Sequence, residues 1–419
     1  MTKRRGKRSV VALFVLALVA ISCSRSSDFE AGELGSVTVR PGEAIQIRSL
    51  QAISEPDSAL GVPQDNAIRL AVEHYGLIAG HAVEVDTALD EFCSEEGGQT
   101  ASDMIVAEAQ VVGVIGTSCD AAAIAAMPGI SEAGMVMLSG SNTSPELTSD
   151  LAANPGSAHH AGYSRTAHND LTQGVAAARF IAEHLGLSSA ALIHDDDPKS
   201  RGLTEAFEME FTQLGGIITS NSAVATGKTD MVPLLTDIAA TKPEAIFMPL
   251  TMADATFIMQ QVGSVAGLED VVAVGANDLL TTDFLEQPES EGMYLVSPDL
   301  RVGDHRNGVT GKSAEDVLSD YQIAYDLDPT SPFWAHAYDA TVILLRAIEA
   351  AGVVEDDVIH IDRQTLRDEI LKSSLEGITG QLRCDEFGDC SSARMIVVLH
   401  RDSSAIDATL QNVVYSYVP

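Results

Sequence analysis

The sequence predicts an α/β protein with two sheets, each with a parallel core and helices on both faces. The chain has 419 residues, which is too many for one hydrophobic core. From residue 44, and again from residue 190, short β-branched runs alternate with amphipathic helical runs, as in βαβ units. The run Val-Val-Gly-Val-Ile at 111–115 has no polar alternation, which is typical of a strand covered on both faces.

Two α/β series follow each other along the chain. In the first, we expect strands at 44–50, 82–86, 111–115 and 135–138, and helices at 64–75, 99–109 and 120–127. In the second, we expect strands at 190–194, 217–224, 245–248, 271–274 and 293–296, and helices at 170–185, 201–214, 230–241 and 253–262. Open parallel sheets bind ligands at the carboxyl ends of their strands, so two facing sheets predict a ligand cleft.

The last part of the chain predicts helices and then strands. Ser313-Ala314-Glu315-Asp316 resembles a capping box that opens a helix over 315–325. A long helix is expected over 334–351, before Gly352, and a further helix from Asp362 to residue 372. Strands are expected at 394–400 and 413–417. This order indicates a chain that crosses between two lobes more than once.

The N-terminus predicts export and a lipid anchor. Several basic residues precede an apolar run at 10–21 that is too short to span a bilayer comfortably, as in a signal peptide. Ala20-Ile21-Ser22-Cys23 resembles a lipobox, with Ala20 in place of the usual Leu. We therefore expect residues 1–22 to be removed and Cys23 to carry lipid on the outer face of the membrane. An ordinary secretory signal with a chance cysteine is the alternative. Residues 23–43 are expected to form a flexible tether.

The charge disfavours a nucleic-acid partner. With 25 basic and 60 acidic residues, the formal net charge is −35, which repels phosphate backbones and anionic lipid heads. The sequence contains no nucleophile elbow, dinucleotide fingerprint, P-loop or His-Glu-x-x-His motif, so we predict no enzyme and no cofactor. Metal binding by the acidic run at 194–197 is disfavoured, because such runs usually cap helices or face solvent.

Four cysteines remain if Cys23 carries lipid. An even number in an oxidising compartment predicts two disulfides. Cys384 and Cys390 bracket a turn-rich segment that can close a hairpin, which leaves Cys93 and Cys119 as the second pair. Buried thiols are the alternative, whereas zinc is disfavoured because the spacings fit none of the usual ligand patterns.

Several segments share a pattern with one known family. They are the loop at 54–61, the segment 114–119 that ends in Cys119, Ser-Gly-Ser-Asn-Thr-Ser-Pro-Glu-Leu-Thr at 139–148, the segments 164–166 and 170–174, and Ala-Tyr-Asp-Ala at 337–340. In order and spacing, they resemble the periplasmic binding proteins for branched-chain amino acids, of the leucine/isoleucine/valine type. The resemblance covers nearly everything from about residue 44 to residue 400.

The resemblance implies the type 1 periplasmic binding protein fold, which has two Rossmann-like lobes joined by a three-segment hinge. We expect the N-terminal lobe at 44–165 and 299–375, and the C-terminal lobe at 166–298 and 376–419. The lobes would close on a small polar solute, such as an amino acid, a related compound or an amide, and a monomer would pass it unchanged to the permease subunits of an ABC importer. The alternative is a ligand-sensing lipoprotein of the same fold that signals to a membrane partner.

The resemblance also places the ligand residues of the first lobe. Cys93 and Cys119 match the family disulfide, which lies beside Ser118. Thr143 matches the residue whose hydroxyl and N–H contact the ligand, and its neighbours in the site are Ser141, Asn142 and Leu60. Asp120 departs from the pattern, because the family usually has a serine there that donates to the ligand carboxylate. Either Asp120 turns away to cap its helix, or the ligand is a cation, an amide or a polyol without a carboxylate at this point.

The second lobe departs from the pattern as well. Lys199 stands where the family has an aromatic residue. Its side chain is expected either to be a solvated charge in the loop or to contact the ligand directly. Asn277, followed by Asp278, stands where the family has an acid that pairs with the ligand ammonium. Thr251 lies where the family often has another tyrosine. Phe333 and Trp334 lie at the start of the long helix, near the expected cleft. They are expected either to pack in the hydrophobic core or to line the wall of the cleft.

Overall fold

The computed structural model describes residues 2, 29–195, 197–225, 227–391 and 393–418. The chain divides into two compact units, residues 1–30 and 31–419, and the helices and strands of the described residues lie in the second unit. The apolar run at 10–21 and Cys23 lie outside the described residues. Within the described ranges, no helix is long and apolar enough to cross a membrane.

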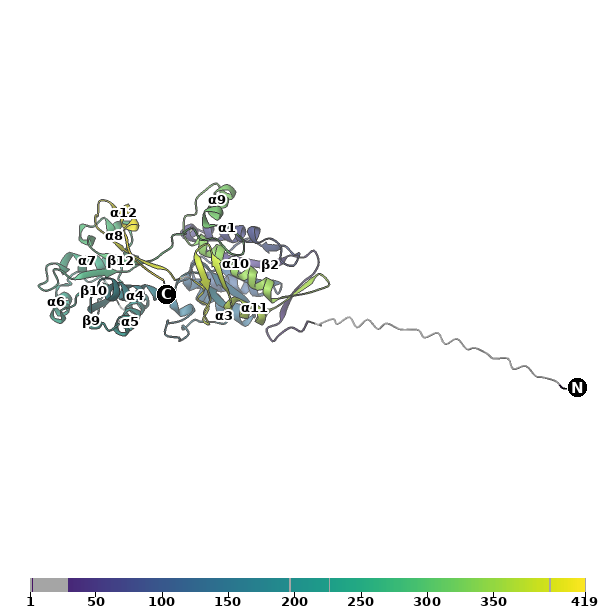
Figure 1. Cartoon of the computed structure of the whole chain (residues 1–419), viewed down its shortest axis with the longest axis horizontal. Coiled ribbons are helices and arrows are strands. Elements are labelled where there is room, and N and C mark those ends of the chain that lie inside the picture. The colour runs from purple at the N-terminus through teal and green to yellow at the C-terminus, as the bar shows by residue number, and fades with distance from the viewer. Residues whose placement is uncertain (1, 3–28, 196, 226, 392, 419) are drawn as a thin grey trace. The chain divides into compact units, whose positions relative to one another are not determined.

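The first sheet has six parallel strands in the order β3-β2-β5-β6-β7, with β4 beside β2. They are β2 (Ile45–Gln51), β3 (Val83–Val85), β4 (Leu89–Asp90), β5 (Val111–Gly116), β6 (Val136–Ser139) and β7 (Tyr163–Arg165). The helices around it are α1 (Ser58–Tyr75), α2 (Glu95–Val106), α3 (Asp120–Glu132), α10 (Trp334–Ala351) and α11 (Arg363–Leu371) (Figure 1). Helices α1, α10 and α11 bury one face around Ile47 and Ile343, and α2 and α3 bury the other around Val114 and Ile105.

The second sheet has seven strands in the order β18-β17-β12-β11-β10-β8-β9, of which β17 and β18 are antiparallel additions to a parallel core. They are β8 (Ser189–His194), β9 (Ile217–Ala223), β10 (Ala245–Met248), β11 (Val272–Gly275), β12 (Tyr294–Pro298), β17 (Met395–Leu399) and β18 (Val413–Tyr417). Its helices are α4 (Thr172–Arg179), η2 (Phe180–His184), α5 (Pro198–Gln213), α6 (Val232–Thr241), α7 (Met252–Val262), α8 (Thr282–Leu285) and α12 (Ile406–Gln411). Helices α4 and α5 pack around Phe207 on one face, and α6 and α7 pack around Ile258 on the other.

The chain passes between the two sheets three times. The first passage joins β7 to α4, and the second joins β12 to α9 (Ala314–Tyr325), which packs on α1 through Tyr321. The third joins the hairpin of β15 (Ser374–Gly377) and β16 (Gly380–Arg383) to β17. The first and third passages are tied together, because the Arg165 guanidinium pairs with the Asp389 carboxylate. The sequence-based prediction of two α/β lobes connected by several crossovers is thus confirmed.

Several features of the fold differ from the sequence-based expectations, which placed no strand at 36–39, 352–355, 358–362, 374–377 or 380–383. Residues 36–39, which we expected to be part of a tether, form β1 (Ser36–Val39), an antiparallel partner of β14 (Val358–Asp362), which also pairs with β13 (Gly352–Glu355). The side chains of Val37 and Val39 are buried in the first-lobe core, which explains why this segment is ordered as a strand. Helix α1 begins at Ser58, ahead of the expected residue 64.

Local sequence signals account for the ends of several elements. The expected capping box of α9 is present, with Ser313 and Asp316 each bonded to the other's backbone N–H. Asp362 caps α11 by accepting the N–H of Thr365. Short helical turns are η1 (Pro145–Leu147), η3 (Asn277–Leu279) and η4 (Pro288–Ser290). Two of them, η1 and η3, follow the strand ends that carry the candidate site.

Candidate ligand-binding site

The first-lobe part of the candidate site consists of two loops at the carboxyl ends of neighbouring parallel strands. Residues 117–120 follow β5, and residues 140–144 follow β6. Side chains from the two loops meet, because Ser141 Oγ donates to the Ser118 carbonyl over 2.8 Å. Helix α1 joins them, since Gln64 Nε2 donates to Ser141 Oγ over 3.0 Å and to the Leu60 carbonyl over 3.1 Å. This is the location that open α/β sheets use for ligands.

Asp120 binds the second loop directly. It is the first residue of α3, and its Oδ1 accepts the backbone N–H of Thr143 at 3.0 Å and of Ser144 at 3.2 Å. Asp120 therefore does not turn away to cap α3, which was one of the two expected alternatives. Burial raises the pKa of Asp120, and the Ser144 and Thr143 N–H groups and the Arg165 charge oppose this increase.

Thr143 connects this loop to the first passage between the sheets. Its hydroxyl donates to Asp170 Oδ2 over 3.1 Å, and its carbonyl accepts the Asp170 N–H at 3.0 Å. Asp170 Oδ1 accepts a bond from Gln173 Nε2 at 3.2 Å, and His168 Nε2 lies 3.4 Å from the same oxygen. Burial alone would raise the pKa of the Asp170 carboxyl, but contacts with His168 and the charge of Lys199 hold it below its ordinary value.

The second-lobe loops extend this chain of hydrogen bonds. Gln173 Oε1 accepts the N–H of Asn277, which follows β11, at 3.3 Å. Lys199, near the start of α5, pairs with Asp278 over 2.9 Å between Nζ and Oδ1. Burial would lower the pKa of the Lys199 ammonium, but the charges of Asp170, Asp278 and Asp120 raise it. Thr143, Asp170, Gln173 and Asn277 thus form a continuous polar path from one sheet to the other.

A buried arginine supports the loop after β6. The Arg165 guanidinium donates to the carbonyl oxygens of Ser144 at 2.7 Å and Asn142 at 3.4 Å, and to Thr148 Oγ1 at 2.6 Å. Its side chain is fully buried, and the Asp389 carboxylate balances its charge. A fully buried charge needs both an ion pair and hydrogen bonds, and Arg165 has both. The loop therefore depends on contacts from the first and third passages.

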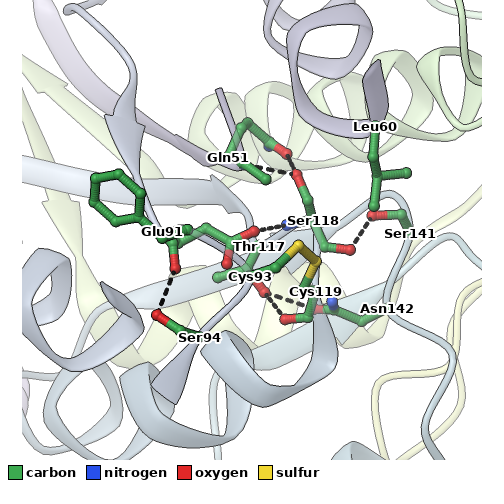
Figure 2. Close-up of a disulfide and its surroundings, with 12 residues drawn as sticks. Gln51, Leu60, Glu91, Cys93, Ser94, Thr117, Ser118, Cys119, Ser141 and Asn142 are labelled. Carbon is green, nitrogen blue, oxygen red and sulfur yellow. Dashed lines mark hydrogen bonds between the residues drawn. A yellow bond between two sulfur atoms is a disulfide. The ribbon is translucent and has the colours of Figure 1, made fainter. Parts of the chain in front are cut away.

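The Cys93–Cys119 disulfide holds the other loop in place (Figure 2). Next to it, Ser118 Oγ donates to Gln51 Oε1 over 2.7 Å, and the Ser118 N–H donates to Glu91 Oε1 over 3.2 Å. Burial raises the pKa of Glu91 from 4.5 to about 7, against the backbone N–H groups of Ser118, Cys119 and Cys93, which lower it. The second disulfide, Cys384–Cys390, closes the short loop that carries Asp389.

Four other candidate residues lie outside the polar path between the two sheets. Leu60 and Phe333 are half-buried, and Thr251 is exposed at the start of α7. Trp334 is 5% exposed and packs in the core cluster of α1, α9 and α10, beside Tyr321. Ligand contact by these four residues stays a prediction.

Sequence reasoning missed several residues that structure the site. These are Glu91, Arg165, His168, Asp170 and Gln173. For all of these except Glu91, the available signal was the position of 164–174 at the first crossover, where polar residues adjoin the ligand loop.

Comparisons with known proteins agree on one family. A model of the periplasmic binding protein family matches residues 44–385. The chain belongs to the periplasmic binding protein family. It is 24% identical over 322 residues to the Leu/Ile/Val-binding protein BraC3 of Rhizobium johnstonii, which covers 74% of this chain and 81% of that one.

Solved structures of such proteins share the fold. A putative branched-chain amino acid ABC transporter protein from Rhodospirillum rubrum aligns with a TM-score of 0.66 at 22% identity, covering 86% of this chain and 98% of that one. An ABC transporter substrate-binding protein from Desulfitobacterium hafniense, solved with Leu, aligns with a TM-score of 0.64 at 21% identity, covering 86% and 98%. The predicted type 1 fold and family are therefore confirmed. Proteins of this family bind solutes outside the cytoplasm and are not enzymes.

Proposed function

We propose that this periplasmic binding protein captures a small polar solute between its lobes and delivers it to the permease subunits of an ABC importer. One observation carries the proposal. The polar path from Thr143 through Asp170 and Gln173 to Asn277 connects the ligand loops of both sheets through the first passage. A ligand that contacts both ends of this path favours one lobe arrangement over others, which is how binding drives hinge closure.

The relatives support transport as the role. Their names describe leucine-, isoleucine- and valine-binding proteins, and one solved relative holds Leu. We further propose that residues 1–22 are removed after export, that Cys23 is lipidated, and that the protein acts as a monomer on the outer face of the membrane. The expected lipobox at 20–23 supports this anchor.

A thermal-shift screen of the purified protein tests the binding function. The panel contains amino acids, amides, polyamines, ureas and sugars. A true ligand at a hundredfold excess over its Kd stabilises the fold by about 2.7 kcal/mol. A flat response across the whole panel would count against the proposal.

A matched pair of variants then places the site. Thr143→Ala removes the hydroxyl that bonds Asp170, and it should weaken binding of any hit about tenfold or more. Thr87→Ala, at an exposed position after β3, should leave affinity unchanged. If Thr143→Ala binds as tightly as the Thr87→Ala control, Thr143 is not part of the site.

A further inference from the structure

Two backbone donors of the first-lobe loop after β6 are already occupied. The N–H groups of Thr143 and Ser144 both donate to Asp120 Oδ1. A ligand carboxylate that sought these donors would have to displace the Asp120 carboxylate and then lie beside it. Two carboxylates in one site repel each other unless one is protonated or a cation intervenes. The Thr143 hydroxyl is also engaged, because it donates to Asp170 Oδ2.

The charges around this point leave an excess of negative charge. Asp120, Asp170 and Asp278 provide three carboxylates, and Lys199, which interacts with all three, provides one ammonium. With all three carboxylates ionised, the balance is two negative charges. Arg165 does not change this balance, because Asp389 neutralises it.

Buried polar atoms without partners point to a missing ligand at the same place. The His168 side chain is 95% buried, and within the described residues its Nδ1 has no hydrogen-bond partner, whereas Nε2 faces Asp170 Oδ1 at 3.4 Å. Asn277 Oδ1, at the other end of the polar path, is buried and likewise has no partner among the described residues. Buried polar groups are rarely left unsatisfied, so these atoms are candidates for contact with a bound molecule.

From these observations we infer that the site takes a small organic cation without a carboxylate at the Thr143 end, such as a primary amine, an amidine or a guanidine. The inference rests on the proposed function and names its ligand class. The Asp120 carboxylate accepts the backbone hydrogen bonds that the carboxylate of an amino-acid ligand would otherwise accept. A ligand ammonium or guanidinium then donates to Asp120, Asp170 and Asn277 Oδ1, and its positive charge offsets the excess negative charge.

Titration calorimetry with defined probes tests the inference. Agmatine and putrescine represent the cations, and leucine and glutamate represent the carboxylates. We expect the wild-type protein to bind at least one cation, with an affinity that falls as salt rises, and to bind neither amino acid. Binding of leucine without binding of either cation overturns the inference but leaves the proposed function standing. If no probe binds and the wider screen is also flat, both fail.

Two variants with opposite expected effects on cation affinity separate a role in binding from a role in folding. Asp120→Asn should weaken cation binding at least tenfold, and Lys199→Met, which removes the competing ammonium, should strengthen it severalfold. Asp86→Asn, at an exposed position after β3 and outside both loops, is the charge control and should change little. If Asp120→Asn is misfolded by circular dichroism, Lys199→Met decides the question. Unchanged or weaker cation binding by Lys199→Met contradicts the inference.

Discussion

Replacement of Glu91 by glutamine should make the stability of the protein less dependent on pH. The Glu91 side chain is fully buried, its Oε1 accepts the Ser118 N–H, and Oε2 has no hydrogen-bond partner among the described residues. Its pKa of about 7 in the folded protein lies above the ordinary value of 4.5. The folded state therefore holds a proton that the unfolded chain releases between these two pH values. This contribution to stability is complete below pH 4.5 and is lost as the pH rises through 7.

The magnitude follows from the two pKa values. Between pH 5 and pH 8.5, the wild-type protein should lose about 2.5 kcal/mol of unfolding free energy that Glu91→Gln does not lose. Urea unfolding followed by circular dichroism, at several pH values and without reductant, measures the difference. Glu96→Gln, an exposed substitution in the first turn of α2, controls for the change in net charge. If the curves of Glu91→Gln and wild type stay parallel across this range, Glu91 is ionised throughout and the reasoning is wrong.

Two further predictions concern the loop after β6. Arg165→Met leaves the Asp389 carboxylate without its ion-pair partner and should lower the free energy of unfolding by about 3–5 kcal/mol. Adding Asp389→Asn should restore part of this loss. A loss below 1 kcal/mol in urea unfolding contradicts the prediction. Gly140→Ala places a Cβ 2.6 Å from the Ala337 nitrogen, so it should cost about 1–3 kcal/mol and weaken ligand binding. Gly263→Ala, whose Cβ meets nothing within 4 Å, is the matched control, and equal melting temperatures of the two variants would refute the packing argument.

Local periodicity was sufficient to predict most helices and strands. Each βα unit carries its own pattern, so α3, α10 and β17 begin within a residue of the positions expected from the sequence. The strand β1 was missed because its partner β14 lies more than 300 residues away, and a four-residue strand has little pattern of its own. The start of α1 was missed because Gly61 and Pro63 resemble helix breakers. Gly61 is required there, since a Cβ would lie 2.1 Å from the Ala52 carbonyl oxygen.

The candidate site was less accessible to sequence reasoning than the fold. Thr143 and Asp120 could be located from the loop pattern and from the cysteine that precedes Asp120. What Asp120 does could not be predicted, because its partners lie in a loop 23 and 24 residues further along the chain. Asp170 resembles an ordinary residue ahead of a helix, and only the folded crossover brings its carboxylate to the Thr143 hydroxyl.

The link between Arg165 and Asp389 has a mechanical consequence. The ion pair joins two of the three backbone segments that connect the lobes. The Cys384–Cys390 disulfide closes a short loop in one of these two segments. Any relative motion of the two lobes must therefore carry the first and third connecting segments together as long as the Arg165–Asp389 pair holds.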